Sequence, residues 1–168
     1  GEYLQKTFFI PLGMKNTGVH YAGIKLENEA HGYITNNGKF DEALNWDMSW
    51  AGGAGALYST VKDLYVWNEA VFNGKVLSEE SLKAAFTPTI LNNQQKIDYG
   101  YGWSVSEFRG VNLIAHSGGL HGFVSYLERQ PENQRPPAPE LVSVRATQLP
   151  VPDVRGIRPA RYERQLRA

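Results

Sequence analysis

Three short apolar segments follow one another closely in the second half of the chain, and they constrain the fold more than any other feature. They span residues 99–105, 111–115 and 122–127 and are rich in β-branched and aromatic side chains. The connections between them are too short for a crossover, so neighbouring segments must run antiparallel. We therefore predict three consecutive strands of an antiparallel meander.

Helices are expected before this sheet. Apolar residues recur at helical spacing in residues 2–10 and 60–72. Residues 79–86 lie between a capping serine, Ser78, and a stop signal, Pro88, which also predicts a helix. Ser59 or Thr60 is placed to cap the second helix and Ser78 the third, because hydroxyl side chains accept from free N–H groups at a helix start. Helices packed on an antiparallel sheet define an α+β fold.

Two further short strands are predicted at residues 21–26 and 32–35. The sequence Asn36-Asn37-Gly38 follows the second of them, and it is a turn signal of the kind that closes hairpins.

The segment His116-Ser117-Gly118-Gly119 carries the most informative chemistry in the chain. It follows an apolar strand and supplies a hydrogen-bond donor, a hydroxyl group and two residues without a β-carbon. A serine acyl-transfer site needs such groups opposite its nucleophile, because donors hold a substrate carboxylate and glycines let the backbone approach an acyl oxygen. We interpret this segment as one wall of an active site.

Composition divides the chain near Arg129. Residues 1–128 hold nine basic and thirteen acidic side chains (9 − 13 = −4), and residues 129–168 hold eight arginines and four acids (8 − 4 = +4). Seven of the nine prolines lie in the second part, where no helical or strand period persists. We therefore expect a domain over residues 1–129 and a largely disordered Pro/Arg-rich tail over residues 130–168.

Two other interpretations of the tail remain. Clustered arginine is typical of nucleic-acid and membrane-surface binding, but here single arginines are spread among acids, so we expect no nucleic-acid partner. A change from lysine to arginine with added proline is also what a shifted reading frame or a fused foreign segment would produce.

Four motifs occur in a characteristic order. They are PLGMKNT at 11–17, AGGAGALYSTVKDL at 51–64, YGYGW at 99–103 and HSGGLHGF at 116–123. Together they resemble the serine beta-lactamase-related family of penicillin-binding proteins, class C beta-lactamases, D-aminopeptidases and esterases, over about residues 1–133. The resemblance implies a partial beta-lactamase/transpeptidase-like fold and, in the parent protein, acyl-enzyme hydrolysis of an ester, amide or beta-lactam.

In that family a serine in SxxK attacks the acyl carbonyl, a tyrosine motif assists proton transfer, and a third motif lies on the sheet edge facing them. The resemblance assigns the third motif to His116, Ser117 and Gly118, with the backbone N–H of Gly119 as an oxyanion donor. It makes His116 and Gly119 catalytic, and His116, Ser117 and Gly118 substrate-binding. Trp50 lies beside the glycine loop at residues 51–55, which favours a place in the wall of the substrate cleft, and a core position is at least an equal alternative. The nucleophile and the tyrosine motif are expected upstream of Gly1, so we expect no activity from these residues alone.

One SxxK sequence does occur, at residues 59–62. A serine and a lysine one helical turn apart could form a nucleophile and its base. The alternative, which we favour, is a helix start capped by Ser59 or Thr60 with Asp63 in its first turn.

The remaining expectations concern partners. The chain has no cysteine, which excludes disulfides, thiolate zinc sites and cysteine nucleophiles, and His116 and His121 lack metal-ligand spacing. We predict no metal, no cofactor and no transmembrane segment; the expected partner is a small-molecule or peptide acyl substrate. A non-catalytic relative that binds peptide or cell-wall fragments is the alternative function. Oligomeric state and compartment are not predicted, although the parent family is often periplasmic or secreted.

Overall fold

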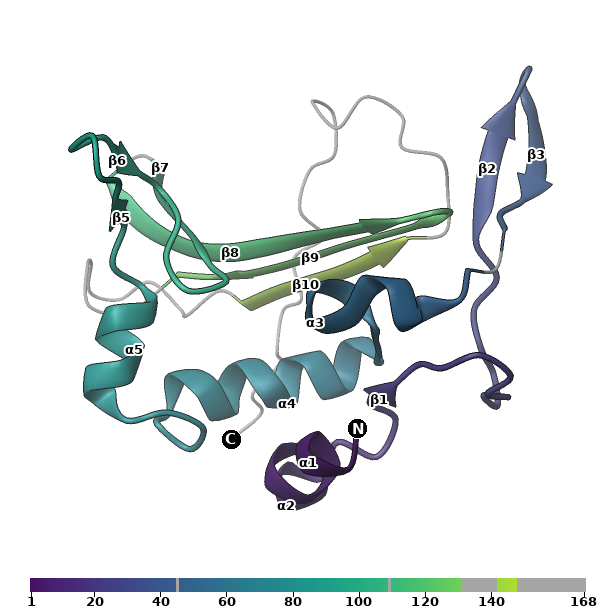
Figure 1. The fold of residues 1–168 in the computed structure, drawn as a ribbon, viewed down its shortest axis with the longest axis horizontal. Coiled ribbons are helices and arrows are strands. Elements are labelled where there is room, and N and C mark those ends of the chain that lie inside the picture. Colours follow the sequence, from purple (N-terminus) through teal and green to yellow (C-terminus); the bar gives the residue numbers. More distant parts are fainter. Residues whose placement is uncertain (45, 109, 131–141, 148–168) are drawn as a thin grey trace, which may run out of the picture.

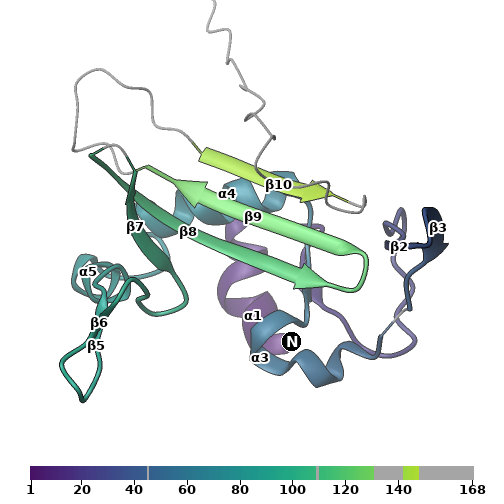
Figure 2. The ribbon, with the colours of Figure 1, turned by 90° about the horizontal axis from the view of Figure 1, so that it is seen from above.

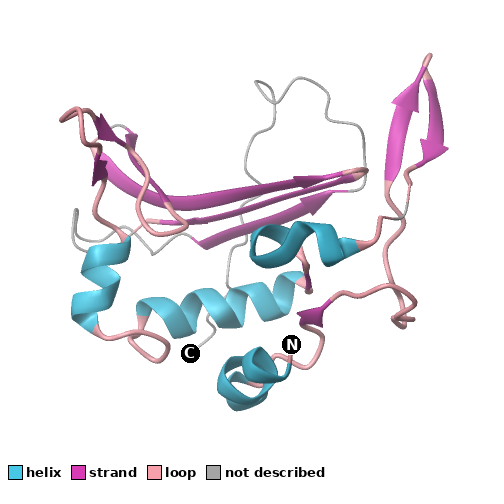
Figure 3. Cartoon of the chain, viewed as in Figure 1, coloured by secondary structure: helices cyan, strands magenta, loops and turns pink. Residues whose placement is uncertain are grey.

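The computed structural model describes residues 1–44, 46–108, 110–130 and the backbone of 142–147. Its centre is a four-stranded antiparallel sheet in the order β10-β9-β8-β7. Helix α4 (Val61–Phe72) lies along one face of this sheet, as Figures 1 and 2 show. In the described part of the chain, helices cover only that face (Figure 3). The α+β architecture predicted from the sequence is confirmed.

The predicted meander is confirmed, with different boundaries. Its strands are β7 (Ser104–Phe108), β8 (Val111–Leu120) and β9 (Phe123–Arg129), each antiparallel to the next. β7 begins later than expected because Gly102 adopts a left-handed φ of 77°, which breaks the extended chain. β8 continues further than expected, so the segment from His116 to Gly119 lies within the strand rather than beyond it.

The tail differs from the expectation of disorder at one place. Residues 142–147 form β10 (Val142–Thr147), which pairs antiparallel with β9 from Val124 to Arg129. The sequence there alternates small or branched apolar residues with polar ones, which is a strand pattern. The proline-rich composition on both sides hides this short pattern when the tail is judged as a whole. Residues 131–141 and 148–168 lie outside the described part, and the division at residue 129 stays a prediction.

Both capped helices form as predicted. The hydroxyl of Thr60 accepts a hydrogen bond of 3.2 Å from the backbone N–H of Asp63 at the start of α4. Ser78 accepts one of 3.2 Å from the N–H of Ser81 at the start of α5 (Glu79–Ala85). In each helix a side-chain oxygen thus satisfies one of the free donors of the first turn.

A partly buried ion pair joins the sheet to α4. Arg129, at the end of β9, is 5% exposed; its Nη1 donates to Asn68 Oδ1 at 2.8 Å and to Glu69 Oε1 at 2.9 Å. Its guanidinium also lies 4.4 Å from the ring centroid of Phe72. The face of the sheet that carries Arg129 and its cross-strand partner Ile114 therefore faces α4.

The core between these layers consists of small aliphatic and aromatic side chains. Phe72, Phe86 and Trp103 form a cluster of ring contacts with centroids 4.9 to 6.1 Å apart. The buried apolar residues are Phe9, Met14, Ala56, Ala70, Val71, Ala85, Ile114 and Ala115.

The N-terminal segment is helical, as expected. It comprises α1 (Glu2–Leu4), a π-helical turn η1 (Gln5–Phe9) and α2 (Ile10–Leu12). The helix ends at Gly13, whose φ of 72° is the left-handed conformation common just after a helix. Pro11 lies inside the last turn rather than ending it.

Three two-stranded ribbons complete the described part of the fold. β1 (Gly18–Val19) pairs with β4 (Leu57–Tyr58), β2 (Tyr33–Asn36) with β3 (Lys39–Glu42), and β5 (Thr89–Ile90) with β6 (Lys96–Ile97). The turn between β2 and β3 forms where the Asn-Gly signal predicts it, with φ of 47° at Asn37 and 76° at Gly38. The strand expected at 21–26 does not form. A 3-10 turn η2 (Met48–Ala51) and a short helix α3 (Gly52–Gly55) lead from the hairpin to β4.

Candidate active site

The second half of β8 is an open strand edge. β7 pairs with β8 only as far as Ser104↔Ala115, whereas β9 pairs with it from Ile114 to Leu120. Residues 116–120 therefore have a strand neighbour on one side alone among the described residues, and all five are exposed. The segment that the sequence singles out coincides with this open edge.

The register shows which backbone groups point out of the sheet. Leu120 and Phe123 flank a two-residue turn, and successive pairs along an antiparallel ladder alternate between hydrogen-bonded and non-bonded. Residues 120, 118 and 116 thus direct their backbone groups toward β9. Ser117 and Gly119 direct theirs away from β9, where the described chain offers no strand. Two N–H groups and two carbonyls are available there for a bound molecule.

Tyr99 lies against His116. The tyrosine hydroxyl and His116 Nε2 are 2.9 Å apart, and the rings meet at 62° with centroids 6.1 Å apart. Tyr99 lies just before β7, and an isolated bridge to Ser104 fixes its backbone. Tyr101 and Trp103 follow Tyr99 at alternate positions, but Tyr101 is 75% exposed and Trp103 packs in the core. No sequence spacing signals the Tyr99–His116 pair.

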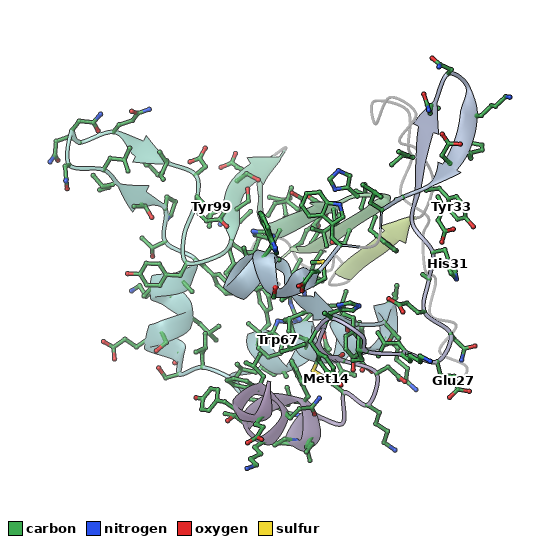
Figure 4. The ribbon with its side chains drawn as sticks, turned by 45° about the vertical axis from the view of Figure 1, so that its right-hand side comes forward. Met14, Glu27, His31, Tyr33, Trp67 and Tyr99 are labelled. Atoms are coloured by element: carbon green, nitrogen blue, oxygen red, sulfur yellow. The ribbon has the colours of Figure 1, made fainter. Side chains whose placement is uncertain are left out.

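The turn after the open edge is held by the N-terminal half of the chain. The His121 ring stacks on Trp46 at 4.5 Å, with 21° between the planes. Gly122 lies so close to Gly32 and Tyr33 that a β-carbon on Gly122 would come within 2.6 Å of the Tyr33 nitrogen. Figure 4 shows Tyr33 and His31 at the base of the β2–β3 hairpin, on the opposite side of the view from Tyr99. The open edge is thus fixed at both ends by residues outside the sheet.

Trp50 is on the surface. It lies in η2, and 84% of it is exposed, which is incompatible with a core position. Its assignment as a substrate-binding residue stays a prediction.

The Ser59-x-x-Lys62 sequence forms a helix start. Ser59 Oγ lies 2.8 Å from Thr17 Oγ1, and Thr17 Oγ1 donates to the buried carboxylate of Asp63 at 2.9 Å. Lys62 is exposed, and no hydrogen bond between it and Ser59 occurs in the described structure. These contacts favour a capping and bridging role for this segment over that of a nucleophile and base.

The carboxyl group of Asp47, which follows the β2–β3 hairpin in the sequence, has a shifted pKa. The pKa of Asp47 lies below its ordinary value because the Ser49 backbone N–H donates to the carboxylate, at 3.0 Å. The Ser49 side chain and the charge of His20 add to the effect. This fixes a negative charge at the start of η2.

Other features lie away from the open edge. A cavity of about 270 Å³ is lined by Pro11, Leu12, Tyr65, Val66, Glu69, Ala70 and Lys75, between α2 and α4. Within the described ranges, no three His, Cys, Asp or Glu side chains are grouped as metal ligands would be. None of the described helices has the length and apolar character needed to span a bilayer.

Comparison with known proteins places these observations in a family. The sequence model of the family described as Beta-lactamase matches residues 1–168. Penicillin-binding protein 4* of Bacillus subtilis (strain 168) is 27% identical over 148 residues, which are 80% of this chain and 33% of that protein. Beta-lactamase-like protein 4 of Dictyostelium discoideum is 29% identical over 135 residues, covering 73% of this chain and 24% of that protein. The chain thus spans a quarter to a third of the length of these relatives.

Solved structures show the same fold. The octameric penicillin-binding protein homologue from Pyrococcus abyssi has a TM-score of 0.64 at 26% identity, covering 79% of this chain and 31% of that chain. D-amino acid amidase from Ochrobactrum anthropi SV3 has a TM-score of 0.63 at 24% identity, with 79% and 42% covered. FmtA from Staphylococcus aureus has a TM-score of 0.67 at 19% identity, with 91% and 39% covered.

Proposed function

This chain belongs to the beta-lactamase family, and we propose that residues 116–119 form the sheet-edge half of a serine hydrolase site. In the complete site a serine acts through an acyl-enzyme on an ester, amide or beta-lactam. The observation that carries the proposal is that His116, Ser117, Gly118 and Gly119 lie on the open half of β8. A substrate that lies along this edge meets both side-chain and backbone donors.

The edge has a definite part in the chemistry. The serine oxygen attacks the acyl carbonyl while a base of the complete site takes the hydroxyl proton; a C–O bond forms, and negative charge moves to the carbonyl oxygen. The N–H of Gly119, directed out of the sheet, donates to that oxygen and stabilises the charge. When the tetrahedral species collapses, the bond to the leaving group breaks and the leaving group takes a proton. Water then attacks the acyl-enzyme in the same way and releases the acid.

His116 and its neighbours hold the substrate in this reaction. His116 offers a ring N–H, and Ser117 offers a hydroxyl and an outward N–H, which suit a substrate carboxylate or carbonyl. Gly118 has no side chain between the edge and the substrate. A β-carbon at Gly118 would come within 2.5 Å of Ser125 Oγ on β9, so a side chain there would require the Ser125 hydroxyl to rotate.

The nucleophile, in this proposal, comes from polypeptide outside residues 1–168. Two observations support this: Ser59 is engaged with Thr17 at the start of α4, and Lys62 is exposed. The relatives are three to four times as long as the matched part, which leaves room for a further catalytic segment. Residues 1–168 alone then have no hydrolase turnover, because groups that act as a unit fail together.

The test uses the polypeptide encoded in frame from before Gly1 through residue 168. We expect it to hydrolyse nitrocefin or a p-nitrophenyl ester, and His116→Ala to lower kcat/KM by about 100-fold, as for loss of a transition-state donor. His31→Ala is the matched control, because His31 is exposed and its contact is to Glu42 on the hairpin. Equal activity of the two variants would contradict the assignment of His116.

A second measurement tests the nucleophile. A fluorophosphonate probe should leave Ser59 unlabelled in residues 1–168, and labelling of Ser59 detected by peptide mass spectrometry would overturn the proposal.

The alternative is a non-catalytic relative that binds an extended peptide along the same edge. The outward backbone groups of Ser117 and Gly119 favour it, because an extended peptide can add to an open strand edge. Retention of a peptide or cell-wall fragment without turnover in the longer polypeptide would support this alternative. A nucleic-acid or membrane-surface role of the arginine-rich tail is the weaker alternative, and it concerns residues 130–168, most of which lie outside the described part.

A further inference from the structure

We propose that Tyr99 is a positioning residue that holds neutral His116 in the tautomer with its proton on Nδ1. The Tyr99 hydroxyl lies 2.9 Å from His116 Nε2, which is hydrogen-bond distance for an O–H group and a ring nitrogen. The proposal concerns which ring nitrogen of His116 carries the proton, and hence what the ring can offer to a bound molecule.

The direction of this hydrogen bond follows from the acidity of the two groups. A phenol O–H is a good donor and a weak acceptor, whereas the unprotonated nitrogen of an imidazole is a strong acceptor. The favourable arrangement is therefore Tyr99 O–H donating to Nε2. Because a neutral imidazole has one N–H, the proton then sits on Nδ1. Among the described residues no hydrogen bond to His116 Nδ1 competes with this arrangement.

Tyr99 is well placed to impose the tautomer because its backbone is fixed on two sides. Its carbonyl oxygen accepts from the Thr89 N–H at 3.0 Å and from Thr89 Oγ1 at 2.8 Å. It also bridges to Ser104 at the start of β7. His116 in turn is held in the ladder between β8 and β9. The two rings thus meet from separate anchored backbones, so little ordering is needed to form the bond.

The chemical consequence is that His116 faces a ligand as a donor. With Nε2 occupied by Tyr99, Nδ1–H is the free ring group in the neutral form, and it remains an N–H when the ring is protonated. Nδ1 has no lone pair with which to take a proton. Resting on the proposed function, this means that His116 donates a hydrogen bond to the acyl substrate and does not act as a general base.

The first test reads the tautomer directly and needs no catalysis. Residues 1–168 are prepared with ¹⁵N-labelled histidine, and ring ¹⁵N shifts are recorded with the imidazoles neutral; His116→Gln assigns the signal. We expect a bare Nε2 and a protonated Nδ1 for His116. Tyr99→Phe, which removes only the hydroxyl, should shift the ring toward the Nε2–H tautomer. A protonated Nε2 in the parent chain, or an unchanged tautomer in Tyr99→Phe, would overturn the proposal.

Tyr101→Phe is the matched control for this substitution. Tyr101 lies two residues away and is 75% exposed, so loss of its hydroxyl should leave the His116 signals unchanged. A change as large as that in Tyr99→Phe would show that the shift does not report the Tyr99–His116 bond, and it would count against the proposal.

The second test measures the catalytic consequence in the longer polypeptide. Tyr99→Phe should lower kcat/KM by about fivefold, the value of one neutral hydrogen bond, and should have no further effect in a His116→Gln background. An equal effect in both backgrounds would overturn the positioning role. If the Nδ1–H tautomer is found and no substrate is hydrolysed, the proposed function fails and the tautomer assignment stands.

Discussion

At the scale of single residues, Asp63 links the N-terminal loop to α4. It is 3% exposed, and its Oδ2 accepts from the backbone N–H of Asn16 at 2.7 Å and from Thr17 Oγ1 at 2.9 Å. Two donors depend on one carboxylate oxygen. Removal of that oxygen takes the acceptor from the Asn16 N–H and leaves the buried Thr17 hydroxyl with Ser59 Oγ as its remaining partner at 2.8 Å, next to the space of the lost carboxylate.

We therefore expect Asp63→Ala to lower the free energy of unfolding by about 2 to 3 kcal/mol in urea titrations. Asp63→Asn keeps an acceptor oxygen and should lose less. Glu27→Ala, at an exposed carboxylate, is the control and should be close to neutral. A loss at Asp63 no larger than that at Glu27 would show that these bonds add nothing to stability.

Asp47 gives the chain a local pH dependence. Hydrogen bonds from Ser49 lower the pKa of Asp47 below its ordinary value of 3.8 in the folded protein, whereas the unfolded chain keeps that value. A carboxylate with a lowered folded pKa stabilises the structure fully above the ordinary value, and this contribution is lost as pH falls through the folded pKa. The loss therefore belongs to the range below pH 3.8.

NMR can follow this loss at the Ser49 amide. Its signal should titrate with a midpoint below 3.8 as the cap of η2 opens, and Asp47→Asn should abolish the transition. A midpoint at or above 3.8 would contradict the assigned role of Ser49.

At the scale of elements, the β8–β9 turn makes a tight contact with the base of the β2–β3 hairpin at a glycine with left-handed φ. Gly122 has φ of 79°, and a β-carbon there would meet Tyr33 and Gly32 backbone atoms at 2.6 to 2.7 Å. Gly38 has nearly the same φ of 76° but open space around it. Substitutions at the two positions therefore distinguish the cost of the left-handed φ from the cost of the steric contact.

Both Gly122→Ala and Gly38→Ala should cost about 1 kcal/mol from the left-handed φ. Only Gly122→Ala should cost a further 1 to 3 kcal/mol, roughly, because backbone atoms must move apart. Thermal unfolding of the two variants gives the difference. Similar losses of stability in the two variants would mean that the hairpin makes no tight steric contact with the turn.

The same elements show what a sequence can predict. Helix caps, the Asn-Gly hairpin and the meander were predictable because each depends on residues within a few positions of one another. Tyr99–His116 and His121–Trp46 pair side chains 17 and 75 positions apart in the sequence, and no local pattern marks them. β10 was missed because its partner, β9, stabilises a strand whose surroundings look unstructured. The proposed site residues rest on their sequence motif, whereas the open edge on which they lie depends on where β7 stops and could not be predicted from the motif.

At the scale of the whole molecule, the open half of β8 is an unprotected strand edge. Unpaired N–H and C=O groups on such an edge promote pairing between copies, and a lysine on the edge suppresses it. Leu120 is 48% exposed in this strand, and Leu44, which lies outside the strands of the sheet, is 75% exposed.

We expect residues 1–168 to self-associate with rising concentration, as measured by light scattering. Leu120→Lys should reduce this association more than Leu44→Lys, although the latter removes the more exposed side chain. Equal effects would indicate general apolar contact rather than edge pairing.

The stacking of Trp46 on His121 can form only after both residues have been synthesised. The β2–β3 hairpin leaves the ribosome first, but the turn that covers its base appears roughly eighty residues later, which takes about 4 to 16 s at ordinary elongation rates. Through this interval Trp46 has no His121 to cover it. The indole of Trp46 is therefore more exposed in the nascent chain than in the folded protein. A chaperone that recognises aromatic side chains could bind it during this interval.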